Sequence, residues 1–157
     1  KEVKFTEFYK VLLYTGLRCT DAFKLQKKHI NERYLSIRMS KTKDLLHIPL
    51  QDNALEILNK RSDHEYLFFE LQSDRQRRNC TQYLKGLFNP DFVRNNNINL
   101  HSFRHTYAHN MLNRGVPKEV LQSFLGHRSI KTTEIYARWV RKEELEKWLI
   151  LMSKERG

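Results

Sequence analysis

Residues 100–109 read L-H-S-F-R-H-T-Y-A-H and open a helix predicted over 101–113. His101 and Arg104 are three positions apart at its start, so both side chains can project from one face. A helix N-terminus offers unpaired N–H groups and a positive dipole end, which favour an anion such as phosphate. His101, His105 and His109 also recur every four residues. This segment alone therefore leaves three interpretations: a phosphate site, a histidine metal site, or a solvent-exposed polar face.

Downstream, the segment L-G-H-R-S at 125–129 places His127 directly after a glycine that should end a helix. Tyr136 follows nine residues later, in T-E-I-Y-A-R. The chain has seven tyrosines, and most tyrosines serve packing. Tyr107 is the only rival nucleophile close to His101. Its spacing from Arg104 directs it deeper along the same helix, which favours core packing.

Upstream, the segment T-G-L-R-C-T-D places Arg18 at the break between two predicted helices. Lys41 and Lys43 lie in the polar turn S-K-T-K-D between two predicted strands. Taken singly these signals are weak, because an arginine in a break often caps a helix and lysines in turns usually serve solubility.

The hydrophobic pattern predicts a mainly α fold with one small antiparallel β-sheet, an α+β class. Gly16, Gly115 and Gly126 are expected to end helices. Thr6 is the expected N-cap of the first helix, and Asn95–Asn97 is expected to be a loop. The predicted strands are 33–39 and 45–48; the predicted helices are 6–16, a short one near residue 20, 51–61, 75–88, 101–113, 117–126, a short piece at 131–138, and a tail at 141–153.

The net charge leaves two interpretations open: a nucleic-acid partner, or a basic housekeeping or ribosomal fold. The 157 residues carry 29 Lys and Arg against 18 Asp and Glu, a formal charge of +11. Cys19 and Cys80 are too few and too far apart for a disulfide framework or a metal motif. No apolar run approaches the roughly 20 residues of a membrane span. We therefore expect a cytoplasmic protein, and the start at Lys1 without Met suggests a fragment.

The order of these elements resembles the tyrosine recombinase family of phage integrases, chromosome-dimer resolvases and conjugative-transposon integrases. G-L-R comes first, then Lys in a β-hairpin that ends I-P-L, then H-x-x-R-H, L-G-H, and a Tyr nine residues after that His. The resemblance runs from about residue 5 to 140 and implies the catalytic-domain fold of that family.

The resemblance also implies a catalytic set. S-K-T-K is similar to the S-K-T-G turn of lambda-type integrases, which favours Lys41 over Lys43 as the family lysine. Asp21 matches an acidic residue that supports the site without reacting. The matched catalytic residues are Arg18, Lys41, His101, Arg104, His127 and Tyr136.

The implied reaction is metal-free cleavage and rejoining of DNA, with no cofactor, through a 3′-phosphotyrosyl intermediate and a released 5′-hydroxyl. Two arginines would clamp the phosphate bidentately with permanent charge. Lys41 would protonate the leaving oxygen. His101 would handle the tyrosine proton, and His127 would donate a hydrogen bond to the phosphate.

The resemblance further implies partners. These are double-stranded DNA, a homo-tetramer on that DNA, and possible accessory DNA-bending proteins; no membrane is involved. Residues 1–157 would form one catalytic domain, with 141–157 a tail helix that docks on a neighbouring protomer or folds back. The basic helix 75–88 is a candidate DNA-backbone contact. The family's N-terminal core-binding domain is expected to be absent from this chain, which should then bind DNA weakly and with little sequence preference.

Three alternatives stay open at this stage. A type IB topoisomerase-like enzyme would share the chemistry but relax supercoils without exchanging partners. A non-catalytic DNA-binding module would keep the fold without the reaction. A histidine metalloenzyme would require a metal ion.

Overall fold

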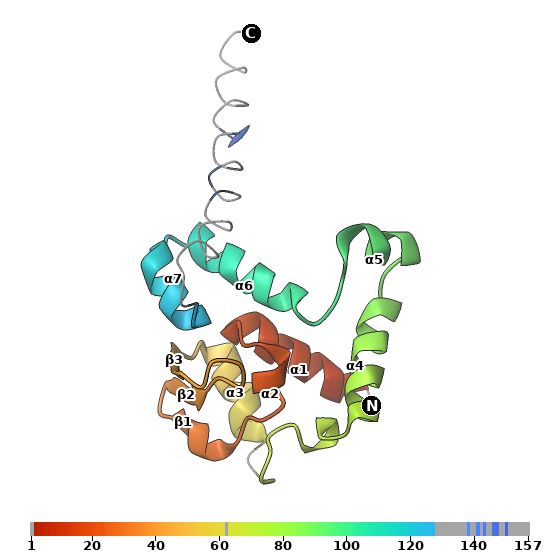
Figure 1. Cartoon of the computed structure of the whole chain (residues 1–157), viewed down its shortest axis with the longest axis vertical. Helices are drawn as coiled ribbons and strands as arrows, with labels where there is room; N and C mark the ends of the chain where they lie inside the picture. Colours follow the sequence, from red (N-terminus) through yellow and green to blue (C-terminus); the bar gives the residue numbers. More distant parts are fainter. Residues whose placement is uncertain are drawn as a thin grey trace. The chain divides into compact units, whose positions relative to one another are not determined.

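The computed structural model describes residues 2–61 and 63–127, together with positions 138, 141, 143, 146, 147 and 150 (Figure 1). The chain divides into two compact units, residues 1–107 and 108–157. The second unit contains the end of α6 (Ser102–Asn113) and α7 (Lys118–Leu125). The predicted piece at 131–138 and tail helix at 141–153 lie outside the described residues, apart from those six positions.

The first unit is organised around α1 (Glu2–Thr15). We predicted that this helix starts after Thr6, and this is wrong: it begins at Glu2, and Phe5 in its first turn packs with its ring 5.6 Å from that of Tyr83. Farther along, Phe8 is fully buried between the rings of Phe23 (4.9 Å) and Phe68 (5.0 Å). Aromatic contacts at these separations are favourable beyond the area they bury, so α1 is the centre of the core.

Next along the chain come α2 (Cys19–Ala22) and a three-stranded antiparallel sheet in the order β1-β2-β3. The predicted hairpin is confirmed as β2 (Tyr34–Arg38) and β3 (Leu45–Pro49). Leu35 opposite Ile48 and Ile37 opposite Leu46 form its buried face. The short β1 (Ile30–Asn31) was not predicted, because two residues are too few to show an alternating pattern.

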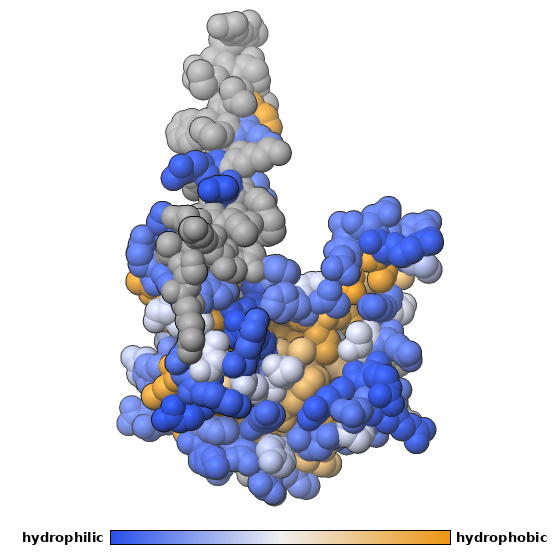
Figure 2. All heavy atoms as spheres, in the orientation of Figure 1, coloured by the Kyte–Doolittle hydropathy of each residue, from blue (hydrophilic) through white to orange (hydrophobic). Residues whose placement is uncertain are grey.

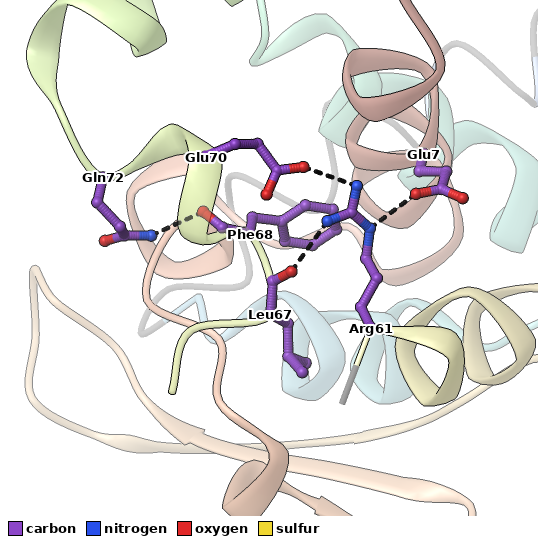
Figure 3. Close-up of polar contacts among 6 residues, drawn as sticks. All are labelled: Glu7, Arg61, Leu67, Phe68, Glu70 and Gln72. Carbon is purple, nitrogen blue, oxygen red and sulfur yellow. Dashed lines mark hydrogen bonds and ion pairs between the residues drawn. The ribbon is translucent and has the colours of Figure 1, made fainter. Parts of the chain in front are cut away.

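The helix α3 (Asp52–Lys60) packs on α1, and Arg61 directly after it forms the centre of a partly buried charge cluster (Figure 3). The Arg61 guanidinium donates to Glu7 at 2.7 Å, to Glu70 at 2.8 Å and to the Leu67 carbonyl at 3.0 Å. It also lies 4.5 Å from the centre of the Phe68 ring. The side chains of Arg61 and Glu70 are only 10% and 12% exposed, so Arg61 ties three segments together away from solvent.

The helix α4 (Asp74–Gly86) is capped by Ser73, whose hydroxyl accepts from the Gln76 N–H at 3.3 Å. The helix α5 (Pro90–Asn96) follows, so the predicted loop at 95–97 is wrong for its first two residues. Only Asn97, at a φ of 49°, leaves the helix. Figure 2 shows hydrophobic surface beside α4 and beneath α5, bordered by hydrophilic side chains; Leu87, Phe88 and Phe92 are among the exposed hydrophobic residues.

Both cysteines are free thiols. Cys80 is buried on α4, where its carbonyl accepts from the Tyr9 hydroxyl at 2.6 Å. Burial raises the pKa of the Cys80 thiol to about 11 and also raises the pKa of the half-buried Cys19. Among the described helices, none is long and apolar enough to cross a membrane.

Candidate active site

Arg104 is the most buried charged group of the predicted site. It lies in the first turn of α6, and Arg104 as a whole is only 2% exposed to solvent. Asn99 sets the start of this helix: its side-chain oxygen accepts from the His101 N–H at 2.8 Å, and its own N–H donates to the Ser102 hydroxyl at 3.0 Å. The Arg104 Nη1 donates to the Gly16 carbonyl at 2.7 Å. This bond fixes the guanidinium through a neutral acceptor.

Arg18 is the N-cap residue of α2, with extended backbone (ψ 142°). Its carbonyl accepts from the Ala22 N–H at 3.0 Å, which fixes the backbone beneath the side chain. The half-buried side chain places Nη1 3.5 Å from the Met39 sulfur. Arg18 is therefore held between α2 and the end of β2, as expected for a residue at a break between elements.

Asp21 connects α2 to the turn that carries the two candidate lysines. This carboxylate is 2% exposed and accepts from the Ser40 N–H at 2.7 Å. Lys24 Nζ donates to the Ser40 hydroxyl at 3.2 Å. The residue directly before Lys41 is thus fixed on both its backbone and its side chain. Asp21 thus holds the turn to α2, the short helix that Arg18 precedes.

The two lysines differ in backbone and in setting. Lys41 and Lys43 are both exposed, but Lys43 has a φ of 65°. The Lys43 carbonyl accepts from Arg38 Nη1 at 3.1 Å, and its N–H donates to the Met39 carbonyl at 3.0 Å. Lys43 therefore closes the hairpin, whereas Lys41 follows the anchored Ser40.

His101 lies where the charges of the site converge. Its pKa is lowered first by burial, and then by the nearby positive groups of His105, Arg104 and Arg18. The rings of His101 and His105 meet edge to face with centroids 4.8 Å apart. The structure thus brings Arg18, His101 and Arg104 together in the first unit and favours a neutral His101 beside two guanidinium groups. This combination can bind a phosphate and accept a proton.

His109 has polar partners within the second unit. In the second unit its Nε2 lies 3.1 Å from Glu143 Oε1, and its Nδ1 lies 3.1 Å from the Asn113 amide nitrogen. Within the described part of the chain, no group of three His, Cys, Asp or Glu side chains is arranged to hold a metal ion.

His127 belongs to the second unit. Gly126, at a φ of 68°, ends α7, and the His127 N–H donates to the Gln122 carbonyl at 3.1 Å. The Gln122 side-chain Nε2 donates to the His127 carbonyl at 3.0 Å. Tyr136 lies outside the described residues. Tyr107, its rival in sequence, is 2% exposed and packs against Gly16, as core packing requires.

Sequence reasoning did not identify several residues that support this site. Met39 and Ser40 hold Arg18 and the lysine turn, and the Gly16 carbonyl holds Arg104. Their roles depend on contacts between segments distant in sequence, so the local sequence pattern does not predict them. Asn99 could have been found, because an Asn just before a helical pattern is typical of a helix start.

Comparison with known proteins points to one family. Residues 2–143 match the model of the phage integrase family. The tyrosine recombinase XerA of Pyrococcus furiosus is 32% identical over 138 residues, which cover 82% of this chain and 48% of that protein. The fold resembles the XerH site-specific recombinase in a post-cleavage complex with a palindromic difH substrate (TM-score 0.72, 17% identity, 94% of this chain and 46% of XerH).

A second solved structure has the same fold. It is the Tn1549 transposon integrase in complex with transposon right end DNA, with a TM-score of 0.62 and 17% identity over 92% of this chain and 59% of that one. The predicted mainly α fold with a small antiparallel sheet is therefore confirmed. The chain spans about half the length of the curated relatives it matches.

Proposed function

Because residues 2–143 match its family model, this chain belongs to the phage integrase family, and we propose that it is the catalytic domain of a tyrosine recombinase that cuts and rejoins double-stranded DNA. The observation that carries the proposal is the meeting of Arg18, His101 and Arg104. Arg18 is 83 positions before His101 in the sequence, yet both Arg18 and Arg104 lie near this histidine and lower its pKa.

The two arginines would bind the non-bridging oxygens of the phosphate that is cut. A guanidinium forms paired, directional bonds to such oxygens and keeps its charge at any accessible pH. The extra negative charge of the pentacoordinate transition state is then stabilised by groups already held in place by Gly16 and Met39. Arg18 and Arg104 would supply the charge that Mg²⁺ provides in many phosphoryl transfers.

The strand is cut when the Tyr136 oxygen bonds to phosphorus and the bond from phosphorus to the 5′ oxygen breaks. His101 would take the proton of the Tyr136 hydroxyl, a role that suits a neutral imidazole. Lys41 would give a proton to the departing 5′ oxygen, and His127 would donate a hydrogen bond to the phosphate. The product is a 3′-phosphotyrosyl link and a free 5′-hydroxyl, and the reverse steps rejoin the strand.

Two further parts of the chain would contribute to DNA binding and assembly: the helix α4 and the segment 141–157. Arg77, Arg78 and Lys85 of α4 line a cavity of about 370 Å³ together with Cys19, Phe23 and Leu100. We propose that this basic edge of α4 contacts the DNA backbone. The segment 141–157 would dock on a neighbouring protomer within a tetramer on DNA, since Leu145, Trp148, Leu149 and Met152 form an apolar stripe in the sequence.

The covalent intermediate provides the direct test. A DNA duplex nicked close to the cleavage site loses a short fragment after cutting, so the phosphotyrosyl adduct accumulates. We expect the wild-type chain to form this adduct and Tyr136→Phe to form none, as seen by gel electrophoresis under denaturing conditions. An adduct that persists in Tyr136→Phe would reject Tyr136 as the nucleophile.

The choice between the two lysines has its own test. Lys41→Ala should lower the cleavage rate by about 10²–10⁴-fold, the usual contribution of a general acid. A 5′-bridging phosphorothiolate leaves without a proton, so it should restore the rate of Lys41→Ala. Lys43→Ala is the matched control, and rescue confined to that variant would move the role to Lys43.

A further inference from the structure

The turn that carries Arg18 has an unusual neighbour on α6. Gly16 ends α1 at a φ of 67°, and its N–H donates to the Leu12 carbonyl at 3.0 Å. Thr15 braces the same turn, since its hydroxyl donates to the Val11 carbonyl at 2.7 Å and accepts from the Leu17 N–H at 3.3 Å. The backbone that leads into Arg18 is thus tightly held on the side of α1.

Tyr107 packs directly against this glycine. A Cβ on Gly16 would lie 2.3 Å from Cδ1 and 2.7 Å from Cε1 of the Tyr107 ring, distances that real side chains do not reach. The ring therefore occupies the space that any other residue at position 16 would need. Tyr107 itself is 2% exposed.

Arg104 binds the same glycine from one turn earlier on α6. Its Nη1 donates to the Gly16 carbonyl at 2.7 Å while the Tyr107 ring covers the α-carbon. Arg104 and Tyr107, on one turn of α6, thus both contact Gly16, which lies two positions before Arg18. The contact connects the turn that presents one arginine with the helix that presents the other.

We propose that Tyr107 is a positioning residue, whose ring sets the Arg18 turn against Arg104 so that both guanidinium groups reach one phosphate. The inference rests on the proposed function. It assigns the ring, and not the hydroxyl, as the working part of Tyr107. The raised pKa of Tyr107, about 12 because of burial, agrees with a hydroxyl that stays protonated.

The proposal predicts a specific pattern among variants. Tyr107→Phe keeps the ring and should retain the cleavage rate to within about threefold. Tyr107→Leu leaves space beneath Gly16, so the Arg18 turn can shift; misplacement of a catalytic group by about 1 Å can lower the rate about 10²-fold. Tyr107→Met fills more of the space and serves as a second variant if Tyr107→Leu is unfolded.

A neutral substrate separates positioning from general loss of structure. A methylphosphonate at the cleavage site lacks one charged oxygen and depends less on a precise pair of arginines. The rate of Tyr107→Leu relative to wild type should therefore fall at least about tenfold less on methylphosphonate than on phosphate. Phe68→Leu is the matched control, because it removes a buried ring of the core that contacts Phe8, and its loss should be equal on both substrates.

The outcomes decide the proposal. Adduct formation is measured in single turnover, with folding followed by thermal unfolding and DNA affinity by titration. A folded Tyr107→Leu or Tyr107→Met with the wild-type rate, or an equal loss on both substrates, would overturn the positioning role, and so would a Tyr107→Phe that loses cleavage. Absence of adduct from the wild type would instead reject the proposed function.

Discussion

Two arginines of the first unit, the partly buried Arg61 and the buried Arg104, are held in opposite ways. Arg61 donates to the carboxylates of Glu7 and Glu70, so its charge is balanced by two acids. Arg104 donates to the Gly16 carbonyl, a dipole that orients the guanidinium but cancels no charge. Both side chains are largely removed from solvent, and these bonds differ: two carboxylates balance the charge of Arg61, whereas the Gly16 carbonyl is a neutral partner of Arg104.

The difference teaches how to separate a structural arginine from a functional one. A carboxylate partner inside a protein neutralises the charge of a guanidinium, and the resulting ion pair holds segments of the chain together. A neutral acceptor such as a carbonyl fixes the position of the guanidinium without neutralising its charge, which can then attract an anionic ligand. Arg18, whose Nη1 lies against the Met39 sulfur, follows the second pattern.

The largest expected effect is on Arg104. Arg104→Met should lower single-turnover adduct formation by about 10³-fold, because it removes one of two groups that stabilise the transition-state charge. The free energy of unfolding should change by less than about 2 kcal/mol, since the lost bond to Gly16 is offset by removal of a desolvated charge. Urea unfolding and the adduct assay measure the two quantities. A strong loss of stability would place Arg104 with Arg61.

The converse is expected of Arg61. Arg61→Ala leaves the buried carboxylate of Glu70 without its partner, so the free energy of unfolding should fall by about 3–5 kcal/mol. Cleavage at a temperature where the variant is folded should be unchanged. Arg33→Ala is the matched control: Arg33 pairs with Asp52 at the surface, where both side chains are more than 60% exposed, and should cost less than about 1 kcal/mol. Equal losses in the two variants would contradict the distinction.

The smallest effect concerns the pH dependence. The charges of His105, Arg104 and Arg18 lower the pKa of His101, after burial as the main cause. A base must be neutral, so cleavage should rise with pH through this lowered pKa. His105→Phe keeps a ring but removes one charge, which raises the pKa of His101 and moves the acidic limb of the rate profile to higher pH by less than about one unit. His64→Phe is the control, and a limb that does not move, or moves to lower pH, would argue against His101 as the base.

Much of the fold was predictable, because long elements have a clear period. Helices at 51–61, 75–88 and 101–113 are confirmed as α3, α4 and α6 within a few residues. The missed elements were short. The helix α5 has seven residues rich in Asn, although Asn89-Pro90 is a recognisable start.

The same distinction applies to the site: residues within local motifs were predictable from the sequence, and residues that act through long-range contacts were not. Arg18, His101 and Arg104 could be proposed from ordered motifs, since each motif is local. Their supports could not, because the bond from Arg104 to Gly16 joins residues 88 positions apart and the one from Arg61 to Glu7 joins residues 54 apart. Only the folded chain shows which charges are balanced. Tyr136 stays a prediction from its spacing to His127.

The raised thiol pKa of both cysteines has a practical consequence for labelling. Alkylating reagents attack the thiolate, and burial keeps Cys80, and to a lesser degree Cys19, in the protonated form at neutral pH. A single cysteine introduced at an exposed position should therefore react well before the native pair. A fluorophore could be attached in this way without removal of either native thiol.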